Sequence, residues 1–279
     1  MRRKMTVKPI KLIALDMDGT TLRRDGSLSQ ENRTAMEDAL AQGVHVVFAT
    51  GRTREALPQN VKAVEGMRYA ITSNGAAVAD LKEDRWLYKN EIKGESIPAV
   101  LNALSGSGLF IEAFVDGRAY MDESWTERIK YYGLPEDYTQ YALITRHPIP
   151  NLFGFLAKQK GIENINVNFG DPELRKQYES RLRAIPGTAL TTSFPHNWEL
   201  GALTVSKADG LRALCEYLGV KREETMAIGD NENDRAMLGF AGCSVAMGNA
   251  SASLQAAAGY VTASCEEDGV AKAIRKFVL

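Results

Sequence analysis

The most constraining feature of the sequence is a short apolar run, Ile10–Leu15, that leads directly into Asp16-Met17-Asp18-Gly19-Thr20. An apolar run that ends in a turn is typical of a buried strand. Open α/β sheets bind their ligands at the carboxyl ends of such strands. Two carboxylates that lie close together need a cation or a proton between them. The pentapeptide therefore predicts a divalent metal, a nucleophilic carboxylate, or both.

Strand and helix signals alternate along the first eighty or so residues, as they do in βαβ units. Ser29 is expected to cap a helix that runs to about Gln42, before a buried strand at Val44–Ala49. Thr53 is expected to cap a short helix that ends near Pro58, and Tyr69–Thr72 is a third strand. The pattern predicts a doubly wound, mostly parallel sheet in an α/β fold.

The middle of the chain has a different character, with hairpins in place of βαβ units. Asp116-Gly117 lies between two apolar runs and is among the strongest short hairpin signals. We read this stretch as an inserted α+β domain, after which the βαβ pattern resumes near Trp198. The expected organisation is a first core segment at 1–82, the inserted domain at 83–196, and a second core segment at 197–279. Further expected elements are hairpin strands at 77–80, 85–89, 110–115 and 118–121, a strand at 165–169, and helices at 96–104, 124–132, 172–184, 207–218, 232–241 and 269–277.

Composition excludes several classes of protein. The chain has 279 residues, a formal net charge of −1 and 44% hydrophobic residues, so neither a nucleic-acid footprint nor a polybasic membrane patch is expected. The basic start, Met1–Lys4, is not followed by a signal-peptide core. No apolar run approaches the roughly 20 residues that cross a bilayer. Three widely spaced cysteines argue against a disulfide framework, so we expect a cytoplasmic protein.

Three further polar clusters are placed where chemistry is possible, although each also has an ordinary structural explanation. Thr50-Gly51-Arg52 follows the second strand and offers a hydroxyl and backbone N–H groups to an anion, or is simply a helix-capping turn. Lys207 opens a helix, where a cation opposes the dipole unless it meets an anion, or it is simply a solvated surface lysine. Asp230, Asn233 and Asp234 offer the oxygen ligands that Mg²⁺ prefers, or form an acidic helix start.

Taken together and in order, the motifs Asp-x-Asp-Gly-Thr, Thr-Gly-Arg, Lys and Gly-Asp-x-x-Asn-Asp resemble those of the haloacid dehalogenase (HAD) superfamily of phosphatases. The chain is most similar to the Cof-type subgroup, and the resemblance covers essentially its whole length. It implies a HAD-like, Rossmannoid core with a large α/β cap inserted after the third strand. One departure is Ala208-Asp209-Gly210 after the lysine, where many relatives have glycine directly.

The resemblance implies a role for each motif residue. Asp16 matches the nucleophile that forms an aspartyl-phosphate, and Asp18 matches the acid/base residue. Mg²⁺ is the implied cofactor, and the implied metal-site residues are Asp16, Asp18 through its backbone carbonyl, Asp230 and Asp234. Asn233 and Asp234 match positions that support the metal or orient Lys207. The residues implied to bind phosphate or substrate are Thr50, Gly51, Arg52, Asn74, Lys207 and Asn233.

The implied function is a Mg²⁺-dependent phosphatase of small phosphorylated metabolites. The expected partner is such a metabolite, with no nucleic acid and no membrane, and the expected state is a monomer or a small homo-oligomer. Sugar phosphates, phosphorylated cofactors and nucleotides all remain open as substrates. Two other functions also remain open. One is a phosphomutase, and the other is a receiver-like module that accepts phosphate on an aspartate for signalling.

Overall fold

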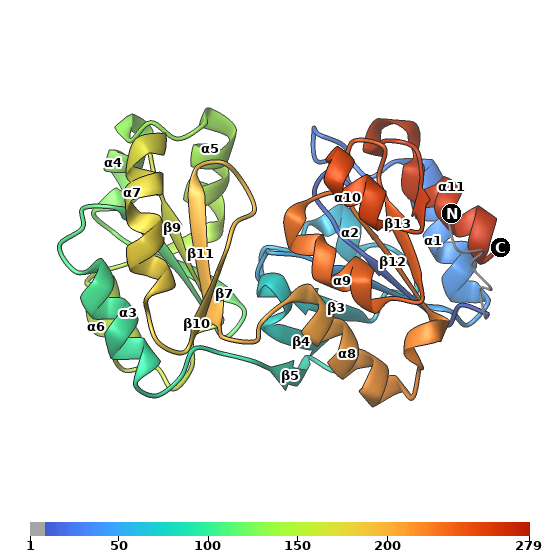
Figure 1. Ribbon diagram of the computed structural model, residues 1–279, viewed down its shortest axis with the longest axis horizontal. Coiled ribbons are helices and arrows are strands. Elements are labelled where there is room, and N and C mark those ends of the chain that lie inside the picture. The colour runs from blue at the N-terminus through green and yellow to red at the C-terminus, as the bar shows by residue number, and fades with distance from the viewer. Residues whose placement is uncertain (1–8) are drawn as a thin grey trace. The chain divides into compact units, whose positions relative to one another are not determined.

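The computed structural model describes residues 9–279, so the basic start of the chain lies outside the described part. The chain divides into two compact units (Figure 1). The core unit contains residues up to Arg52, Leu57–Tyr88 and Ser206–Leu279, and the cap unit contains Thr53–Ala56 and Lys89–Val205. Within residues 9–279, no helix combines the length and the apolar character needed to cross a membrane.

The core unit is built on an eight-stranded sheet in the order β14-β13-β12-β1-β2-β3-β4-β5. The six strands from β14 to β3 run parallel, and β4 turns back antiparallel to β3. The central strands are buried on both faces, which explains their nearly continuous apolar sequences. Their bounds are β1 (Leu12–Leu15), β2 (His45–Ala49), β3 (Tyr69–Thr72), β4 (Ala77–Asp80), β5 (Arg85–Lys89), β12 (Thr225–Gly229), β13 (Cys243–Ala246) and β14 (Tyr260–Val261).

Helices cover both faces of this sheet, as a doubly wound fold requires. Apolar residues of α1 (Gln30–Ala41) and α11 (Gly269–Phe277) pack on one face, and α2 (Gln59–Lys62) contributes Val61. Residues of α8 (Lys207–Leu218), α9 (Arg235–Phe240) and α10 (Ala252–Ala257) pack on the other. Figure 1 shows α1 and α11 side by side. The expected α/β fold class is confirmed.

Side-chain caps explain where the two longest core helices begin. The Ser29 hydroxyl accepts a hydrogen bond from the Asn32 N–H at the start of α1, and the Ser206 hydroxyl accepts one from the Asp209 N–H at the start of α8. Such caps stabilise a helix by about 1 kcal/mol each. Ser206 thereby fixes the position of Lys207, the first residue of α8.

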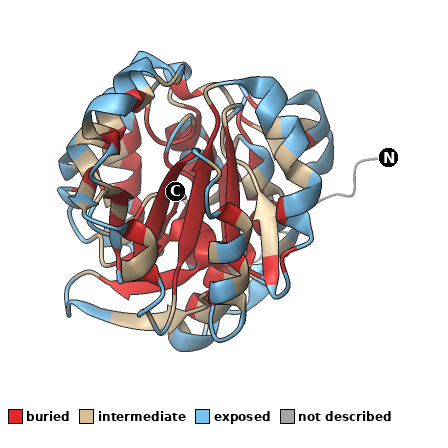
Figure 2. Ribbon diagram, turned by 90° about the vertical axis from the view of Figure 1, so that its left-hand side faces the viewer, coloured by how far each residue is buried: buried red, intermediate tan, exposed pale blue. Residues whose placement is uncertain are grey.

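The cap unit contains a six-stranded sheet in the order β10-β11-β9-β6-β7-β8. One face is apolar and packs against α3, α6 and α7, whereas α4 and α5 pack on the other. The strands are mostly buried, while the helices have exposed outer faces (Figure 2). The bounds are β6 (Phe110–Val115), β7 (Arg118–Asp122), β8 (Arg146–Ile149), β9 (Asn164–Asn168), β10 (Thr188–Thr191), β11 (Asn197–Ala202), α3 (Ser96–Leu104), α4 (Trp125–Arg128), α5 (Glu136–Thr145), α6 (Leu152–Leu156) and α7 (Pro172–Arg183).

Several sequence-based expectations need correction. Strand β5, which follows the expected boundary at 82/83, extends the core sheet and is not part of the inserted domain. The strand at Asn197–Ala202 pairs with β9 and β10 in the cap sheet, not in the core. The contacts therefore divide the chain at 88/89 and 205/206, a few residues after the expected boundaries of 82/83 and 196/197.

Two helix expectations also differ from the structure. Residues 53–58 are not helical; the short helix α2 begins only after Pro58, because the residue before a proline disfavours the helical conformation. The expected helix at 124–132 is a four-residue α4 followed by a 3₁₀ turn at Ile129–Tyr131. The hairpin around Asp116-Gly117 forms as predicted, with β6 antiparallel to β7.

Candidate active site

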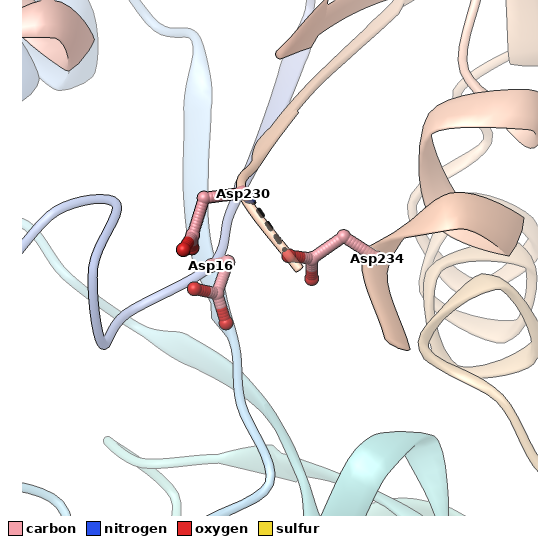
Figure 3. Close-up of side chains that lie close together, drawn as sticks. All are labelled: Asp16, Asp230 and Asp234. Carbon is pink, nitrogen blue, oxygen red and sulfur yellow. Dashed lines mark hydrogen bonds between the residues drawn. The ribbon is translucent and has the colours of Figure 1, made fainter. Parts of the chain in front are cut away.

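Three carboxylates meet at the carboxyl ends of neighbouring core strands (Figure 3). Asp16 follows β1 and Asp230 follows β12, and these strands pair in parallel, so their carboxyl ends are adjacent. Asp234 lies in the 3₁₀ turn Glu232–Asp234 that follows. Each residue places one carboxylate oxygen within 4.8 Å of the others. Residues more than 200 positions apart in the chain thus form one acidic cluster, as the sequence predicted.

Lys207 is the cation of this cluster. Its Nζ lies 2.5 Å from Asp16 Oδ1 and 2.6 Å from Asp234 Oδ1, and the residue is only 1% exposed. The second oxygen of Asp234 accepts hydrogen bonds from the backbone N–H groups of Asp230 and Asn231, both at 3.0 Å. One of these is the dashed line in Figure 3. Asp234 therefore ties the lysine to the loop that bears Asp230.

Two residues to which the sequence reasoning gave no role hold Asp230 in place. The Thr20 hydroxyl donates to Asp230 Oδ1 at 2.7 Å. The Asn249 amide donates to the Gly19 carbonyl at 2.8 Å and to Asp230 Oδ2 at 3.4 Å. Asn249 follows β13, so a polar residue beyond the end of a predicted parallel strand was the signal that could have identified it. Thr20 belongs to the opening pentapeptide itself.

The electrostatics of the cluster favour a bound cation. Burial, and then the nearby Asp234 carboxylate, raise the pKa of Asp16 well above its ordinary value. Burial likewise raises the pKa of Asp230, with Asp234 contributing. Burial alone would lower the pKa of Lys207, but the Asp16 and Asp234 carboxylates outweigh it and raise that pKa. One ammonium does not neutralise three carboxylates, and an all-oxygen donor set of this kind fits Mg²⁺.

Asp18 faces a different partner. Arg52 donates from Nε to Asp18 Oδ2 at 2.9 Å and from Nη2 to Asp18 Oδ1 at 2.7 Å, a two-pronged ion pair. The Asp18 side chain is 53% exposed and does not join the buried acidic cluster. Arg52 is itself positioned by its backbone N–H, which donates to the buried Thr50 hydroxyl at 3.1 Å. The structure thus links the first two sequence motifs through an ion pair that sequence reasoning did not anticipate.

The turn at Ser73–Gly75 brings Asn74 beside the Thr50 loop. All three residues have positive φ, at 51°, 56° and 96°, a conformation that is costly for residues other than glycine. The Asn74 N–H donates to the Thr50 carbonyl at 3.0 Å, and its side-chain oxygen accepts from the Asn233 amide at 3.1 Å. Backbone strain of this kind is concentrated at functional sites. Asn74 and Asn233, both predicted to bind substrate, are therefore in direct contact.

Glycines allow these loops to approach one another closely. A Cβ on Gly75 would lie 1.9 Å from the Ser206 carbonyl oxygen, next to the start of α8. A Cβ on Gly210 would lie 2.4 Å from Ile71 Cγ2 and 3.3 Å from Gly75 Cα. Gly210, three positions after Lys207, therefore allows α8 to pack closely against β3. The departure noted in the sequence leaves the lysine position unaffected.

We predict that Gly75→Ala is strongly destabilising because the new methyl group would collide with backbone, not with a flexible side chain. The expected loss of unfolding free energy is about 2–5 kcal/mol, from the positive φ and the overlap together. Gly43→Ala is the matched control, since Gly43 has a φ of 83° and no described atom within 4 Å of the place its Cβ would take. We expect that control to cost only about 1–2 kcal/mol. Urea unfolding followed by circular dichroism measures both, and equal losses would contradict the argument.

Comparison with known proteins places the chain in a family. Residues 13–274 match the family model described as haloacid dehalogenase-like hydrolase. The chain is 33% identical over 274 residues to the 5-amino-6-(5-phospho-D-ribitylamino)uracil phosphatase YcsE of Bacillus subtilis (strain 168), covering 97% of this chain and 96% of that protein.

Two solved structures show the same fold. A haloacid dehalogenase-like hydrolase from B. subtilis superposes with a TM-score of 0.83 at 29% identity, covering 96% of this chain and 100% of that one. The HAD subclass IIB sugar phosphatase BT4131 superposes with a TM-score of 0.79 at 25% identity, covering 96% and 98%. The acidic cluster and its buried lysine thus lie on a fold shared with phosphatases, and the chain belongs to the haloacid dehalogenase-like hydrolase family.

Proposed function

We propose that the protein is a Mg²⁺-dependent phosphatase that hydrolyses small phosphorylated metabolites through an aspartyl-phosphate on Asp16. The observation that supports this most directly is the buried Asp16 carboxylate, 2.5 Å from the Lys207 ammonium and beside Asp230. A carboxylate nucleophile divides hydrolysis into two easier displacements at phosphorus. In the first, an Asp16 oxygen bonds to phosphorus and the alcohol leaves. In the second, water displaces Asp16 and phosphate is released.

Lys207 and Thr50 are the proposed groups that hold the transferring phosphoryl group. Phosphoryl transfer depends mainly on positioning and on neutralising charge at the equatorial oxygens. The buried ammonium of Lys207 supplies a positive charge in a low-dielectric setting, where it is more effective than in water. Asp234, whose second oxygen is held by two backbone N–H groups, keeps that ammonium pointed at Asp16. Gly51 and Asn74, which adjoin Thr50, complete the proposed phosphate and substrate loop.

Asp18 is the proposed proton donor to the leaving alcohol and the base for the attacking water. Its carboxylate is exposed and paired with Arg52, so the pair must open before Asp18 can transfer a proton. Once it leaves Asp18, the Arg52 guanidinium can bind an anionic group of the substrate. We therefore propose that substrate binding exchanges the Arg52 ion pair for a contact with substrate and releases Asp18 for proton transfer.

The proposed Mg²⁺ ligands are the carboxylates of Asp16 and Asp230 together with the Asp18 backbone carbonyl. When bound, Mg²⁺ would supply positive charge to the phosphoryl oxygens. Asp234 was grouped with the ligands in the sequence reasoning. Because both its oxygens already accept protein hydrogen bonds, we now assign it to orienting Lys207. Thr20 and Asn249, which hold Asp230, are the proposed supporting residues of the metal site.

A phosphate-release screen tests the proposed function. The protein with Mg²⁺ should liberate inorganic phosphate from p-nitrophenyl phosphate and from some members of a panel of sugar phosphates and phosphorylated cofactors. That panel should include 5-amino-6-(5-phospho-D-ribitylamino)uracil, the substrate in the name of one relative. EDTA should abolish release. Absence of turnover across the panel would reject a phosphatase, and return of phosphate to another position of the same sugar would indicate a mutase instead.

We predict that Mg²⁺ stabilises the protein more at pH 7 than at pH 5. Because the pKa values of Asp16 and Asp230 are raised on folding, the metal-free native state holds extra protons above the ordinary aspartate pKa, and stability falls as pH rises through the raised values. Mg²⁺ replaces those protons, so its affinity rises over the same window. At a hundredfold excess over its dissociation constant it should add about 2.7 kcal/mol.

Thermal unfolding with Mg²⁺ and with EDTA at each pH measures this difference. Subtracting the EDTA curve removes contributions from other titrating groups. Asp230→Asn should abolish most of the Mg²⁺-dependent shift, whereas Asp38→Asn, an exposed position on α1, should leave it unchanged. An equal Mg²⁺ effect at both pH values would argue against a site built from carboxylates with raised pKa values.

A further inference from the structure

The backbone of Asp16 is held on both sides by buried hydrogen bonds. Its N–H donates to the Ile228 carbonyl of the neighbouring strand β12 at 2.9 Å, and its carbonyl accepts from the hydroxyl of the fully buried Thr21 at 2.6 Å. The chain between Asp16 and Thr21 forms a tight turn, in which the Met17 carbonyl accepts from the Thr21 N–H at 3.1 Å. Because the Asp18 carbonyl belongs to the same turn, the shape of this turn sets the positions of the proposed nucleophile and of one proposed metal ligand.

A second buried side chain holds Thr21 itself. The Asn32 amide donates to the Thr21 carbonyl at 3.2 Å, and Asn32 Oδ1 accepts from the Ala271 N–H at 2.9 Å. Asn32 is fully buried in the first turn of α1, and Ala271 lies in the first turn of α11, which runs beside α1 (Figure 1). The Asn32 side chain thus joins α11 to the turn that bears Asp16.

The helix cap that Asn32 provides explains only half of its hydrogen bonding. The first N–H groups of a helix have no partner inside that helix, so the Ala271 N–H needs an outside acceptor, which Asn32 Oδ1 supplies. An aspartate or a serine is as common a capping residue as asparagine. The other buried residues of α1 are Ala35, Met36 and Ala39, so a polar side chain here is costly unless its hydrogen bonds are made. The amide nitrogen, which capping does not require, is used on the Thr21 carbonyl.

We propose that Thr21 and Asn32 are positioning residues of the phosphatase reaction, which hold the Asp16 backbone so that its carboxylate faces Lys207 and Asp230. This inference rests on the proposed role of Asp16 as the nucleophile. The nucleophile must meet phosphorus in line, and a displacement of about 1 Å can cost about 100-fold in rate. Both side chains bond to backbone carbonyls, Thr21 to that of Asp16 and Asn32 to that of Thr21. Their effect on the reaction therefore passes through the backbone of the turn.

Two substitutions of Thr21 separate the hydroxyl from the rest of the side chain. Thr21→Val removes the hydroxyl and keeps the shape, whereas Thr21→Ser keeps the hydroxyl. With p-nitrophenyl phosphate and saturating Mg²⁺, Thr21→Val should lower kcat by about tenfold or more, because Asp16 is no longer held in line. Its KM should change by less than about twofold, since the loss falls on the transition state and not on substrate binding. Thr21→Ser should restore most of the wild-type kcat.

Thr225→Val is the matched control for the loss of a buried threonine hydroxyl. Thr225 is fully buried, and its hydroxyl donates to the Arg222 carbonyl at 2.6 Å and accepts from the Gly242 N–H at 3.3 Å. It begins β12, so it lies at the opposite end of that strand from Asp230. Thr225→Val should lower the urea midpoint at least as much as Thr21→Val does, because it leaves more backbone groups unpaired. Its kcat should match wild type, and an equal loss of kcat in the two variants would overturn the inference.

A double-mutant cycle tests whether Asn32 acts through Thr21. Asn32→Leu keeps the side-chain volume, removes both hydrogen bonds and should lower kcat by about three- to tenfold in the wild-type background. In the Thr21→Val background it should lower kcat by less than about twofold further, because the two residues act on one turn. Losses that simply multiply would overturn the assignment of Asn32. Full kcat in folded Thr21→Val would overturn the inference whether or not Asn32→Leu folds, whereas a wild type with no turnover of p-nitrophenyl phosphate would overturn the proposed function itself.

Discussion

Asp16→Asn should abolish turnover, lowering kcat by about 10⁴-fold or more, because the amide is a poor nucleophile and no other carboxylate can take its place. Asp230 is engaged by Thr20 and Asn249, and Asp234 is bound to Lys207 and to two backbone N–H groups. The substitution keeps the shape of the side chain. It also removes one of three close carboxylates, so the protein should remain folded.

The decisive measurement is covalent labelling. Wild type quenched during turnover should carry acid-stable, hydroxylamine-labile phosphate, and Asp16→Asn should carry none. Asp38→Asn, at an exposed position of α1, is the matched control and should label and turn over like wild type. Retention of more than a small fraction of activity by a clean Asp16→Asn preparation would place the nucleophile elsewhere.

Local sequence signals predicted the centre of the core unit well. An apolar run followed by polar residues, as in Ile10–Leu15 and the pentapeptide, predicts a buried strand and also predicts which side chains lie at its carboxyl end. Parallel neighbours then bring such ends together, so Asp16 and Asp230 could be placed at strand ends from local signals, whereas it was the family resemblance that grouped Lys207 with them.

The local signals did not indicate which of the two sheets each strand joins. The edge hairpin of β4 and β5 and the strand β11 each have ordinary strand sequences, but neither composition nor periodicity says which sheet they join. The alternation of Asn197 and Glu199 with apolar residues marks a half-polar strand. Its partner β9 lies well before it in the sequence, and its partner β10, which directly precedes it, was not predicted as a strand. Contacts between side chains on separate loops, such as the Asp18–Arg52 ion pair, could not be predicted either, because local signals do not say how two loops lie relative to each other.

Lys207→Met should give the second large effect, on stability and on catalysis together. The ammonium is the sole cation bonded to both Asp16 and Asp234 within residues 9–279, and all three side chains are buried. Removing one partner of a buried ion pair typically costs about 3–5 kcal/mol because the remaining charge is left uncompensated. We expect a loss of that size in EDTA at pH 7, with kcat reduced by about 10²-fold or more as the phosphoryl oxygens lose their charge partner.

The dependence on pH and metal distinguishes this cause from simple loss of packing. Methionine fills most of the lysine volume, so the penalty comes chiefly from carboxylates that are now unpaired. Since the pKa of Asp16 is already raised and should rise further without the ammonium, protonation near pH 5 should recover much of the stability. Mg²⁺ should recover part of it at pH 7, whereas kcat should stay low because the metal cannot occupy the position of the ammonium.

Urea unfolding at pH 5 and pH 7, each with Mg²⁺ and with EDTA, gives four free energies of unfolding. Comparing them distinguishes a stability loss caused by unpaired charge from one caused by lost packing. Lys272→Met, at an exposed position of α11, is the control for loss of a lysine charge and should change neither stability nor kcat appreciably. A stability loss in Lys207→Met that is the same at both pH values would mean that packing, not charge, makes this lysine necessary. A loss that becomes smaller toward pH 5 would show instead that it comes from the Asp16 and Asp234 carboxylates left without the ammonium, the same two groups that raise the pKa of Lys207 against the effect of burial.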